Sequence, residues 1–358
     1  MSKPLLSVEG LTKTYVSGNG LFRPGRIATV VDDVSFTIGR GETFGLVGES
    51  GSGKSTIGRL VLRLIEADAG RITFDGLDLR AQSAPELRAL RRRMQIIFQD
   101  PFSSLDPRVR IGEAIAAPIR LHRLRPPGAV HDRVVELLEL VGLGAHQAER
   151  FPHEFSGGQR QRVAIARALA VEPDLIVCDE PVSALDLSIQ AQVVNLLTEL
   201  RSRLGVSYLF ISHDMAVVRH LATQVGVLYA GRLVETGPAA QIFGNPRHPY
   251  TRMLLAASPS PVPGSGVERR IVAGEPPSPF DRPAGCRFSS RCPHRIEPCT
   301  ERQPPLDTWR EGDHSAACLR AHELEHLTLL SDDESRMSEA YRRRLALLRQ
   351  VRAGRRVR

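Results

Sequence analysis

The chain has 358 residues, a net charge of +8 and 42% hydrophobic residues, which suits about two globular domains and excludes a mostly disordered chain. No apolar run approaches the roughly 20 residues that span a bilayer, and the N-terminal sequence MSKPLLSVEG lacks a signal peptide's apolar core. Residues 341–358 hold eight arginines and no acidic residue, so the rest of the chain is neutral on balance. We therefore expect a cytoplasmic protein that reaches membranes through partners, and no nucleic acid as a partner.

Residues 1 to about 237 alternate short apolar segments with amphipathic ones. Strands are expected near 43–48, 174–179 and 207–212, with helices between them. This alternation predicts an α/β fold with a largely parallel, buried sheet. From about 108 to 155 the periodicity is helical throughout, which indicates an inserted α-helical subdomain. Apolar residues there recur at spacings of three and four: Val134, Leu137, Leu138 and Val141.

The remaining chain divides by composition. One further helical stretch completes a domain over residues 1–257. Proline and serine then punctuate residues 258–285, as in an extended connector. A small four-cysteine module is expected over 286–320 and a basic helical tail over 321–358.

A glycine-rich phosphate-binding loop follows the first apolar strand. The pattern G-x-x-x-x-G-K-[ST] is matched in full, and a helix is expected directly after it. In such loops, backbone N–H groups surround phosphate oxygens, Lys54 reaches the β- and γ-phosphates and Ser55 ligates Mg²⁺. A glycine-rich turn without a ligand is the alternative. The expected phosphate-binding residues are Gly48, Glu49, Ser50, Gly51, Ser52, Gly53, Lys54, Ser55 and Thr56.

Two carboxylates end the apolar run at residues 175–178. Ligands bind at the carboxyl edge of a parallel sheet, so we expect Asp179 to hold Mg²⁺ and Glu180 to orient or deprotonate the water that attacks the γ-phosphate. The alternative is that the pair caps the next helix. Cys178 alternates into the buried strand and is expected to be a small apolar filler.

A second anion site is expected where Ser156, Gly157, Gly158 and Gln159 open a helix. This turn offers a hydroxyl and free backbone N–H groups. The two anion sites suit one phosphate chain held between two protein chains that face each other, rather than within a single protein chain. The motif distinguishes between the many classes of phosphate-loop proteins.

With these motifs, the sequence from about Leu5 to Leu255 resembles the ATP-binding subunits of ABC transporters. The resemblance implies a phosphate-loop NTPase fold with a RecA-like core, an antiparallel β subdomain and an inserted α-helical subdomain. It also implies a head-to-tail dimer, in which Ser156, Gly157 and Gly158 touch the γ-phosphate held by the partner's loop.

Other positions match this family. By resemblance, Tyr15 stacks on adenine, Gln99 lies between the Mg²⁺ site and the permease, Asp186 belongs to a loop at the dimer interface, and His213 contacts the γ-phosphate. The alternatives are purely structural roles: an exposed aromatic at Tyr15, a polar residue at a strand end at Gln99, and helix caps at Asp186 and His213. The implied catalytic residues are Glu180, His213, Lys54 and Gln99.

Three flanking segments look like the oligopeptide/dipeptide importer ATPases: residues 98–107, 152–154 and 245–251. That resemblance implies ATP hydrolysis that drives peptide import at the cytoplasmic face of the membrane. The implied partners are a second ATPase chain, two permease subunits and an extracytoplasmic peptide-binding protein. Importers of other solutes such as nickel, a soluble ABC-type ATPase acting on nucleic acid and a small-molecule kinase are the alternatives.

Four of the five cysteines, Cys286, Cys292, Cys299 and Cys318, fall within 33 residues. Cytosolic thiols stay reduced, so the cluster favours a metal over disulfides. Four thiolates suit either a [4Fe–4S] cluster or zinc. The wide spacing and the resemblance favour iron–sulfur, with zinc or unmetallated cysteines as alternatives, and His294 and His314 are expected at the surface.

The arginine-rich tail has helical spacing of its apolar residues, at Met337, Tyr341, Leu345 and Leu348. A basic amphipathic helix can contact an anionic membrane surface. We favour the alternative of a solvated helix or frayed tail.

Overall fold

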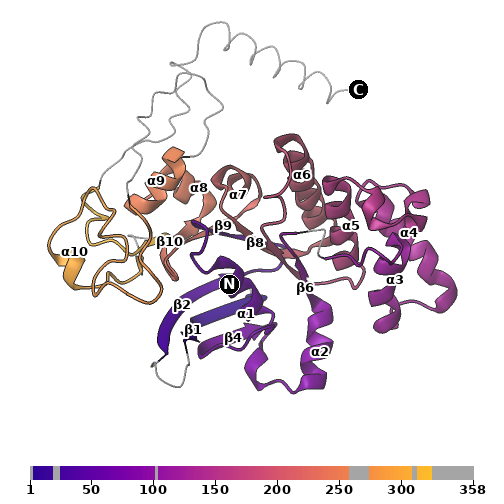
Figure 1. Cartoon of the computed structure of the whole chain (residues 1–358), viewed down its shortest axis with the longest axis horizontal. Helices are drawn as coiled ribbons and strands as arrows, with labels where there is room; N and C mark the ends of the chain where they lie inside the picture. Colours follow the sequence, from indigo (N-terminus) through magenta and orange to yellow (C-terminus); the bar gives the residue numbers. More distant parts are fainter. Residues whose placement is uncertain (1–2, 19–24, 101–103, 258–273, 309–312, 325–358) are drawn as a thin grey trace, which may run out of the picture.

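The computed structural model describes residues 3–18, 25–100, 104–257, 274–308 and 313–324. Two sheets organise this part of the chain (Figure 1). Most of the predicted connector and basic tail, residues 258–273 and 325–358, lie outside the described residues.

The larger sheet has eight strands, and the predicted phosphate loop and carboxylate pair lie at the ends of two of them. β3, β8, β7 and β6 are parallel, β9 is parallel to β3, and β10, β12 and β11 continue antiparallel. In sheet order the strands are β11 (Asp307–Thr308), β12 (Ser315–Ala316), β10 (Arg232–Pro238), β9 (Gln224–Tyr229), β3 (Thr43–Val47), β8 (Ser207–Ser212), β7 (Leu175–Asp179) and β6 (Met94–Ile97).

The central strands are apolar on both faces because both faces are covered. Every residue of β3, β7 and β8 is buried, as parallel strands flanked by helices require. Cys178 of β7 is fully buried, and its burial raises the pKa of the thiol above its ordinary range. It therefore fills space in the core, as the sequence predicted.

The smaller sheet is antiparallel and packs below the larger one in Figure 1. It begins the chain and supplies a second hydrophobic core, centred on residues such as Leu6, Val34 and Phe74. Its strands, in order, are β2 (Arg26–Ile38), β1 (Leu6–Ser17), β4 (Ala69–Phe74) and β5 (Leu77–Asp78).

Helices cover the larger sheet and form a separate group at one end. The α-helices are α1 (Lys54–Val61), α2 (Ala84–Arg93), α3 (Ile111–Leu121), α4 (Val130–Leu140), α5 (Gly157–Leu169), α6 (Leu187–Leu204), α7 (Met215–Leu221), α8 (Ala239–Gly244), α9 (Pro249–Ala257) and α10 (Pro298–Glu301). Short 3₁₀ turns occur at Leu79–Ala81, Pro127–Ala129, Ala145–Glu149 and Pro152–Glu154. None of the helices in the described segments is long and apolar enough to cross a bilayer.

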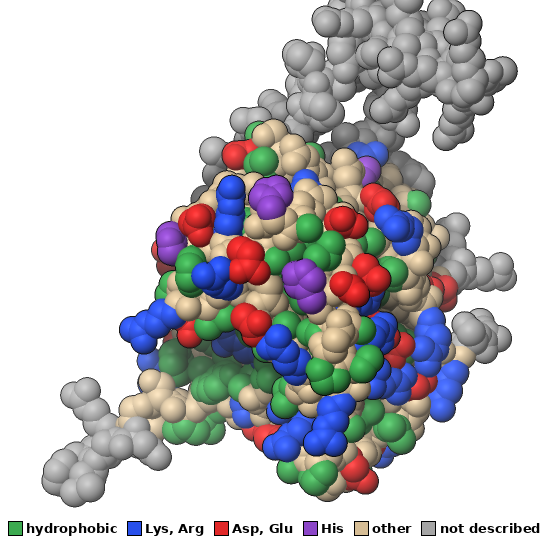
Figure 2. All heavy atoms as spheres, turned by 90° about the vertical axis from the view of Figure 1, so that its right-hand side faces the viewer, with side chains coloured by type: hydrophobic (Ala, Val, Ile, Leu, Met, Phe, Trp, Pro, Cys, Tyr) green, Lys and Arg blue, Asp and Glu red, His purple; other side chains and the backbone are tan. Residues whose placement is uncertain are grey.

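The group at the end consists of α3, α4 and the start of α5, which pack on one another. The four residues whose spacing predicted a helix, listed above, are all buried, three of them in α4 and Val141 as its C-cap. Figure 2 views the molecule from this end and shows acidic and basic side chains intermixed over the visible face. Strong single-sign charge is therefore not a property of this face.

The C-terminal segment returns to the core. Its strand β12 pairs with β10, and the Thr29 backbone N–H of β2 donates to the Pro279 carbonyl at 3.1 Å. His314, expected at the surface, is instead buried and its Nε2 lies 2.7 Å from the Glu235 carboxylate. The expectation was wrong because strand pairing brings the histidine against a fully buried acidic group that needs a partner.

Candidate functional site

The glycine-rich loop joins β3 to α1, and its backbone has no room for side chains at two points. A Cβ on Gly48 would lie 2.2 Å from the Leu228 carbonyl oxygen, and one on Gly53 would lie 2.5 Å from that of Val30. Gly51 and Gly53 also have φ values of 78° and 104°, which favour glycine. The glycines therefore allow the tight turn that an anion-binding loop needs.

Lys54 begins α1 beneath this loop. It is only 4% exposed, and its ammonium donates to the Gly48 and Glu49 carbonyls at 2.8 Å each. Burial lowers the pKa of Lys54, while the nearby carboxylates of Glu180, Asp179 and Glu49 raise it. The amine is thus held inside the loop by its carbonyl groups.

Ser55 and Asp179 form a pair of oxygen donors at the carboxyl end of β7. The Ser55 hydroxyl donates to Asp179 Oδ1 at 2.7 Å. Burial raises the pKa of Asp179, and the hydrogen bond from Ser55 opposes that shift. Hydroxyl and carboxylate oxygens are ligands that Mg²⁺ accepts.

Glu180 stands at the centre of three predicted site residues. Its Oε2 lies 3.2 Å from His213 Nδ1 and 3.4 Å from Gln99 Nε2, and its Oε1 lies 4.0 Å from Lys54 Nζ. Its φ of 47° is a left-handed value in a non-glycine residue, which is typical of functional sites. Gln99, Glu180 and His213 follow β6, β7 and β8, so the parallel sheet brings them to one edge.

The residues expected at a second anion site open α5. The Ser156 hydroxyl accepts from the Gln159 N–H at 3.3 Å, while Gln159 Oε1 accepts from the Ser156 N–H at 3.0 Å. Gly157 and Gly158 face Leu185 and Ile189. Within the described part of the chain, no hydrogen bond or ion pair joins this turn to the phosphate loop.

Asp186 and Tyr15 are two further residues that the family resemblance named. Asp186 caps α6 by accepting the Ile189 N–H at 3.0 Å, and hydrogen bonds to its carboxylate lower its pKa. Tyr15 lies on β1, is 43% exposed, and has the Lys13 ammonium 5.5 Å from its ring centroid. The cap at Asp186 is therefore a structural role, and the Tyr15 ring leaves a face accessible to solvent.

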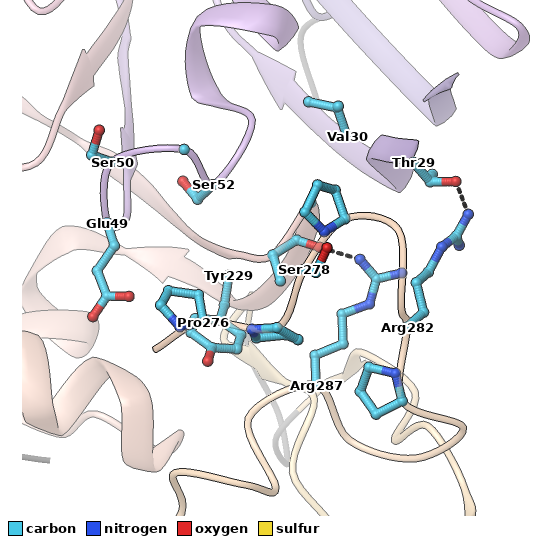
Figure 3. A pocket seen from close by; sticks show the side chains of 16 residues that line it. Thr29, Val30, Glu49, Ser50, Ser52, Tyr229, Pro276, Ser278, Arg282 and Arg287 are labelled. Carbon is cyan, nitrogen blue, oxygen red and sulfur yellow. Dashed lines mark hydrogen bonds between the residues drawn. The ribbon is translucent and has the colours of Figure 1, made fainter. Parts of the chain in front are cut away.

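C-terminal residues contact the phosphate loop, and the sequence had not suggested this. The Glu49 backbone N–H donates to the Tyr250 hydroxyl at 2.9 Å, and Arg291 pairs with the Glu49 carboxylate. A pocket lies between this loop and the proline-rich segment 276–279, with Glu49, Ser50 and Ser52 on one side (Figure 3). The clue was an acidic residue inside a phosphate loop, which calls for a nearby cation.

The four C-terminal cysteines line one small cavity. Cys286 and Cys299 are buried, Cys292 and Cys318 are half-buried, and none forms a disulfide in the described ranges. Cys286 and Cys299 are tied by a backbone hydrogen bond of 2.8 Å. Burial raises the pKa of the Cys286 thiol to about 11 and that of Cys318 to about 12.

No three histidine, cysteine, aspartate or glutamate side chains among the described residues are grouped closely enough to hold a metal ion. His294 lines the cysteine cavity, and His314 is engaged with Glu235.

Comparison with known families gives two separate matches. Residues 31–183 match the family model described as ABC transporter. Residues 234–299 match the model described as oligopeptide/dipeptide transporter, C-terminal region. The second match includes three of the four clustered cysteines.

Named relatives cover nearly all of this chain. It is 53% identical over 317 residues to a peptide import ATP-binding protein of Brucella ovis, covering 88% of this chain and 98% of the relative. It is 44% identical over 319 residues to the dipeptide transport ATP-binding protein DppF of Escherichia coli, covering 89% and 95%.

Among solved structures, the fold resembles a dimeric, post-hydrolysis state of the ATP-binding cassette MJ0796 bound to ADP and Pi. The TM-score is 0.59 at 29% identity, over 65% of this chain and 98% of that chain. The α/β phosphate-loop NTPase fold predicted from sequence is thereby confirmed.

Proposed function

Because this chain belongs to the ATP-binding subunits of ABC transporters, we propose that it binds and hydrolyses ATP to drive the import of peptides through a membrane transporter. The peptide assignment is supported by relatives named for peptide and dipeptide transport and by the match to an oligopeptide/dipeptide transporter C-terminal region. We divide the chain into an ATP-binding domain over 1–257, with a helical subdomain at about 108–155, and a C-terminal four-cysteine module.

ATP binding uses the loop from Gly48 to Thr56 and the accessible ring of Tyr15. The glycine backbone accepts the phosphates and the start of α1 supplies a positive helix end. Lys54 exchanges its carbonyl partners for the β- and γ-phosphate oxygens, and Tyr15 stacks on the adenine.

Ser55 and Asp179, which are joined by a hydrogen bond of 2.7 Å, would hold Mg²⁺, with the Ser55 hydroxyl giving up that hydrogen bond to ligate the ion. When bound there, the ion would offset negative charge on the triphosphate. Asp179 would serve as a direct or water-mediated ligand. Gln99, whose amide nitrogen donates to Glu180, would offer its amide oxygen as a further ligand.

Hydrolysis is assigned to Glu180, and the single observation that carries this role is its convergence with His213, Gln99 and Lys54 within 4.0 Å. Glu180 accepts a proton from the attacking water or orients it, and His213 fixes the carboxylate and contacts the γ-phosphate. Gln99 links this group to the transporter.

Dimerisation completes the site. The turn at Ser156, Gly157, Gly158 and Gln159 is free of the chain's own phosphate loop, and the start of α5 suits the γ-phosphate of a second ATPase chain. Closure of the ATPase dimer on ATP then favours one of two conformations of the pair of permease subunits. We place the subunit at the cytoplasmic face, with an extracytoplasmic peptide-binding protein that delivers the peptide.

The assignment of Glu180 is tested by Glu180→Gln. We expect ATP binding to be retained and steady-state hydrolysis to fall by about 10²- to 10⁴-fold, the usual contribution of a general base. Glu66→Gln, which removes an exposed carboxylate from an ion pair with Arg63, is the matched control and keeps normal turnover. Wild-type hydrolysis by Glu180→Gln would refute the role.

Peptide import is tested in proteoliposomes that contain the whole transporter. We expect ATP-dependent uptake of a labelled dipeptide with the wild-type subunit and none with Glu180→Gln. Uptake of nickel but not of dipeptide or longer peptides would contradict the peptide assignment and leave the ATPase assignment intact.

We also propose a [4Fe–4S] cluster at Cys286, Cys292, Cys299 and Cys318. A [4Fe–4S] cluster takes one cysteine for each of its four irons. The four thiols line one cavity, and their number matches that requirement. When bound, the cluster ties four chain segments together, a structural or regulatory role.

The cluster is tested on the anaerobically purified full chain by metal and sulfide analysis with visible absorption. We expect about four irons and four sulfides per chain and a loss of the absorption in Cys299→Ser. Stoichiometric zinc, or no metal in protein that binds ATP, would contradict the proposed cluster and leave the ATPase assignment unchanged.

A further inference from the structure

We propose that Arg291 is a positioning residue for the ATP site, which holds the phosphate loop through Glu49 and makes ATP affinity depend on the four-cysteine module. The inference rests on the proposed ATP binding. It concerns a residue of the C-terminal module, 242 positions away from the loop residue that it contacts.

The contact is a two-pronged ion pair. Arg291 Nη1 donates to Glu49 Oε2 at 2.9 Å, and Nη2 donates to Oε1 at 3.0 Å. The Arg291 side chain is 7% exposed and that of Glu49 is 27% exposed. A bidentate, largely buried pair of this kind fixes orientation as well as charge, unlike a solvated surface pair.

A second contact holds the backbone of the same loop residue. The Glu49 N–H donates to the hydroxyl of the fully buried Tyr250 at 2.9 Å. Both the side chain and the backbone of Glu49 are thus held from the C-terminal side. Glu49 is the second residue of the phosphate loop, so its position affects the loop that receives the phosphates.

The anchors of Glu49 pack continuously onto the cysteine cavity. The Tyr250 ring centroid lies 4.6 Å from that of Tyr229 and 5.5 Å from that of Phe288, and Phe288 lies 5.9 Å from His248. Phe288 and His248 line the cavity of the four cysteines. Arg291 directly precedes Cys292 in sequence, and its backbone N–H donates to the Phe288 carbonyl at 3.0 Å. A change at the cysteines therefore reaches Arg291 through adjacent packed groups.

Charge gives the direction of the effect. Glu49 belongs to the part of the loop that holds the phosphate-binding lysine, since Lys54 Nζ donates to the Glu49 carbonyl at 2.8 Å. Arg291 neutralises the Glu49 carboxylate. If the guanidinium is removed, an unpaired negative charge remains beside the loop that must accept a triphosphate, and ATP binds more weakly.

The test measures the Kd for Mg-ATP by calorimetry on full-length protein in the Glu180→Gln background, which prevents hydrolysis. Arg291→Gln is expected to raise Kd by about fivefold or more, the lower range of typical coupling between sites. Arg291→Lys, which keeps the charge but loses the two-pronged geometry, is expected to lie between wild type and Arg291→Gln. Arg302→Gln removes an exposed charge from the same module and leaves Kd unchanged.

A double variant separates positioning from simple damage to the module. Glu49→Gln combined with Arg291→Gln removes the unpaired carboxylate, so it is expected to recover at least half of the lost affinity on a logarithmic scale. Damage alone predicts a double variant no better than Arg291→Gln. In hydrolysing protein, Arg291→Gln is expected to raise KM for ATP while kcat stays within about twofold.

The proposal is overturned if Arg291→Gln binds ATP within twofold of its parent, or if the double variant binds as weakly as Arg291→Gln. If Arg291→Gln does not fold, the same comparison is made with Arg291→Lys, and an unchanged Kd overturns the proposal. Absence of ATP binding in the parent protein would instead refute the proposed function, so the two failures are distinguishable.

Discussion

Replacing Tyr250 by Phe should destabilise the protein although the ring keeps its place. Tyr250 is fully buried, and its hydroxyl accepts the Glu49 N–H at 2.9 Å. Phe fills the same volume but leaves that part-buried donor without its acceptor. An unsatisfied buried group costs about 1–3 kcal/mol, so we expect the free energy of unfolding to fall by about 1.5 kcal/mol.

Tyr208 provides a matched comparison with the opposite sign. Its ring is also fully buried, but its hydroxyl has no hydrogen-bond partner among the described residues. Tyr208→Phe removes a polar group that is desolvated without compensation, which should raise the free energy of unfolding by about 1 kcal/mol. The two variants, which each lose one oxygen atom, should therefore differ by about 2–3 kcal/mol.

Urea denaturation followed by circular dichroism measures this difference. With a slope of about 2–3 kcal/mol per molar urea, the midpoints of the two variants should be separated by about 1 M. Equal midpoints, or a lower midpoint for Tyr208→Phe than for Tyr250→Phe, would show that hydrogen-bond satisfaction at Glu49 does not control stability here.

Two further predictions concern acid stability and the start of α5. Hydrogen bonds from Thr14 lower the pKa of Asp68 from 3.8 to about 2, so the stabilisation that this carboxylate gives is present above pH 4 and lost as the pH falls from about 4 to 2. Because the side chain is 40% exposed, we expect a contribution of only about 1 kcal/mol to the free energy of unfolding. Asp68→Asn should flatten the acid-unfolding profile, and a profile parallel to that of the wild type would contradict this. Gly158→Ala brings a Cβ within 2.4 Å of Ile189 Cγ2 and should lower the free energy of unfolding, measured by heat or urea, by about 2 kcal/mol. Gly157→Ala, whose Cβ has its nearest contact at 3.3 Å, should lower it by less. Equal decreases in the two variants would argue against a steric cause.

Sequence patterns predicted the elements whose causes are local. The glycines of the phosphate loop mark places where a Cβ cannot fit, and Lys54 opens the helix that follows. Continuous apolar runs predicted the buried parallel strands near their observed bounds, because strands covered on both faces have no polar side. The spacing of Val134, Leu137 and Leu138 predicted α4 for the same kind of reason.

Tertiary structure decided which of these pieces meet. Gln99 and His213 are 81 and 33 positions from Glu180, and only the sheet order that sets β6, β7 and β8 side by side brings them together. Family resemblance named these residues, but local pattern could not give their distances.

The contacts of the C-terminal module were missed because nothing local encodes them. The local sequence around Arg291 carries no sign of its ion pair with Glu49, which forms because the C-terminal segment returns to the core. His314 was predicted at the surface, but the pairing of β12 with β10 buries it. A periodic pattern reports which face of an element is buried, whereas a charge pair between distant segments depends on the path of the whole chain. The phosphate loop can therefore be predicted from local sequence, whereas its contact with the cysteine module forms only when the whole chain folds.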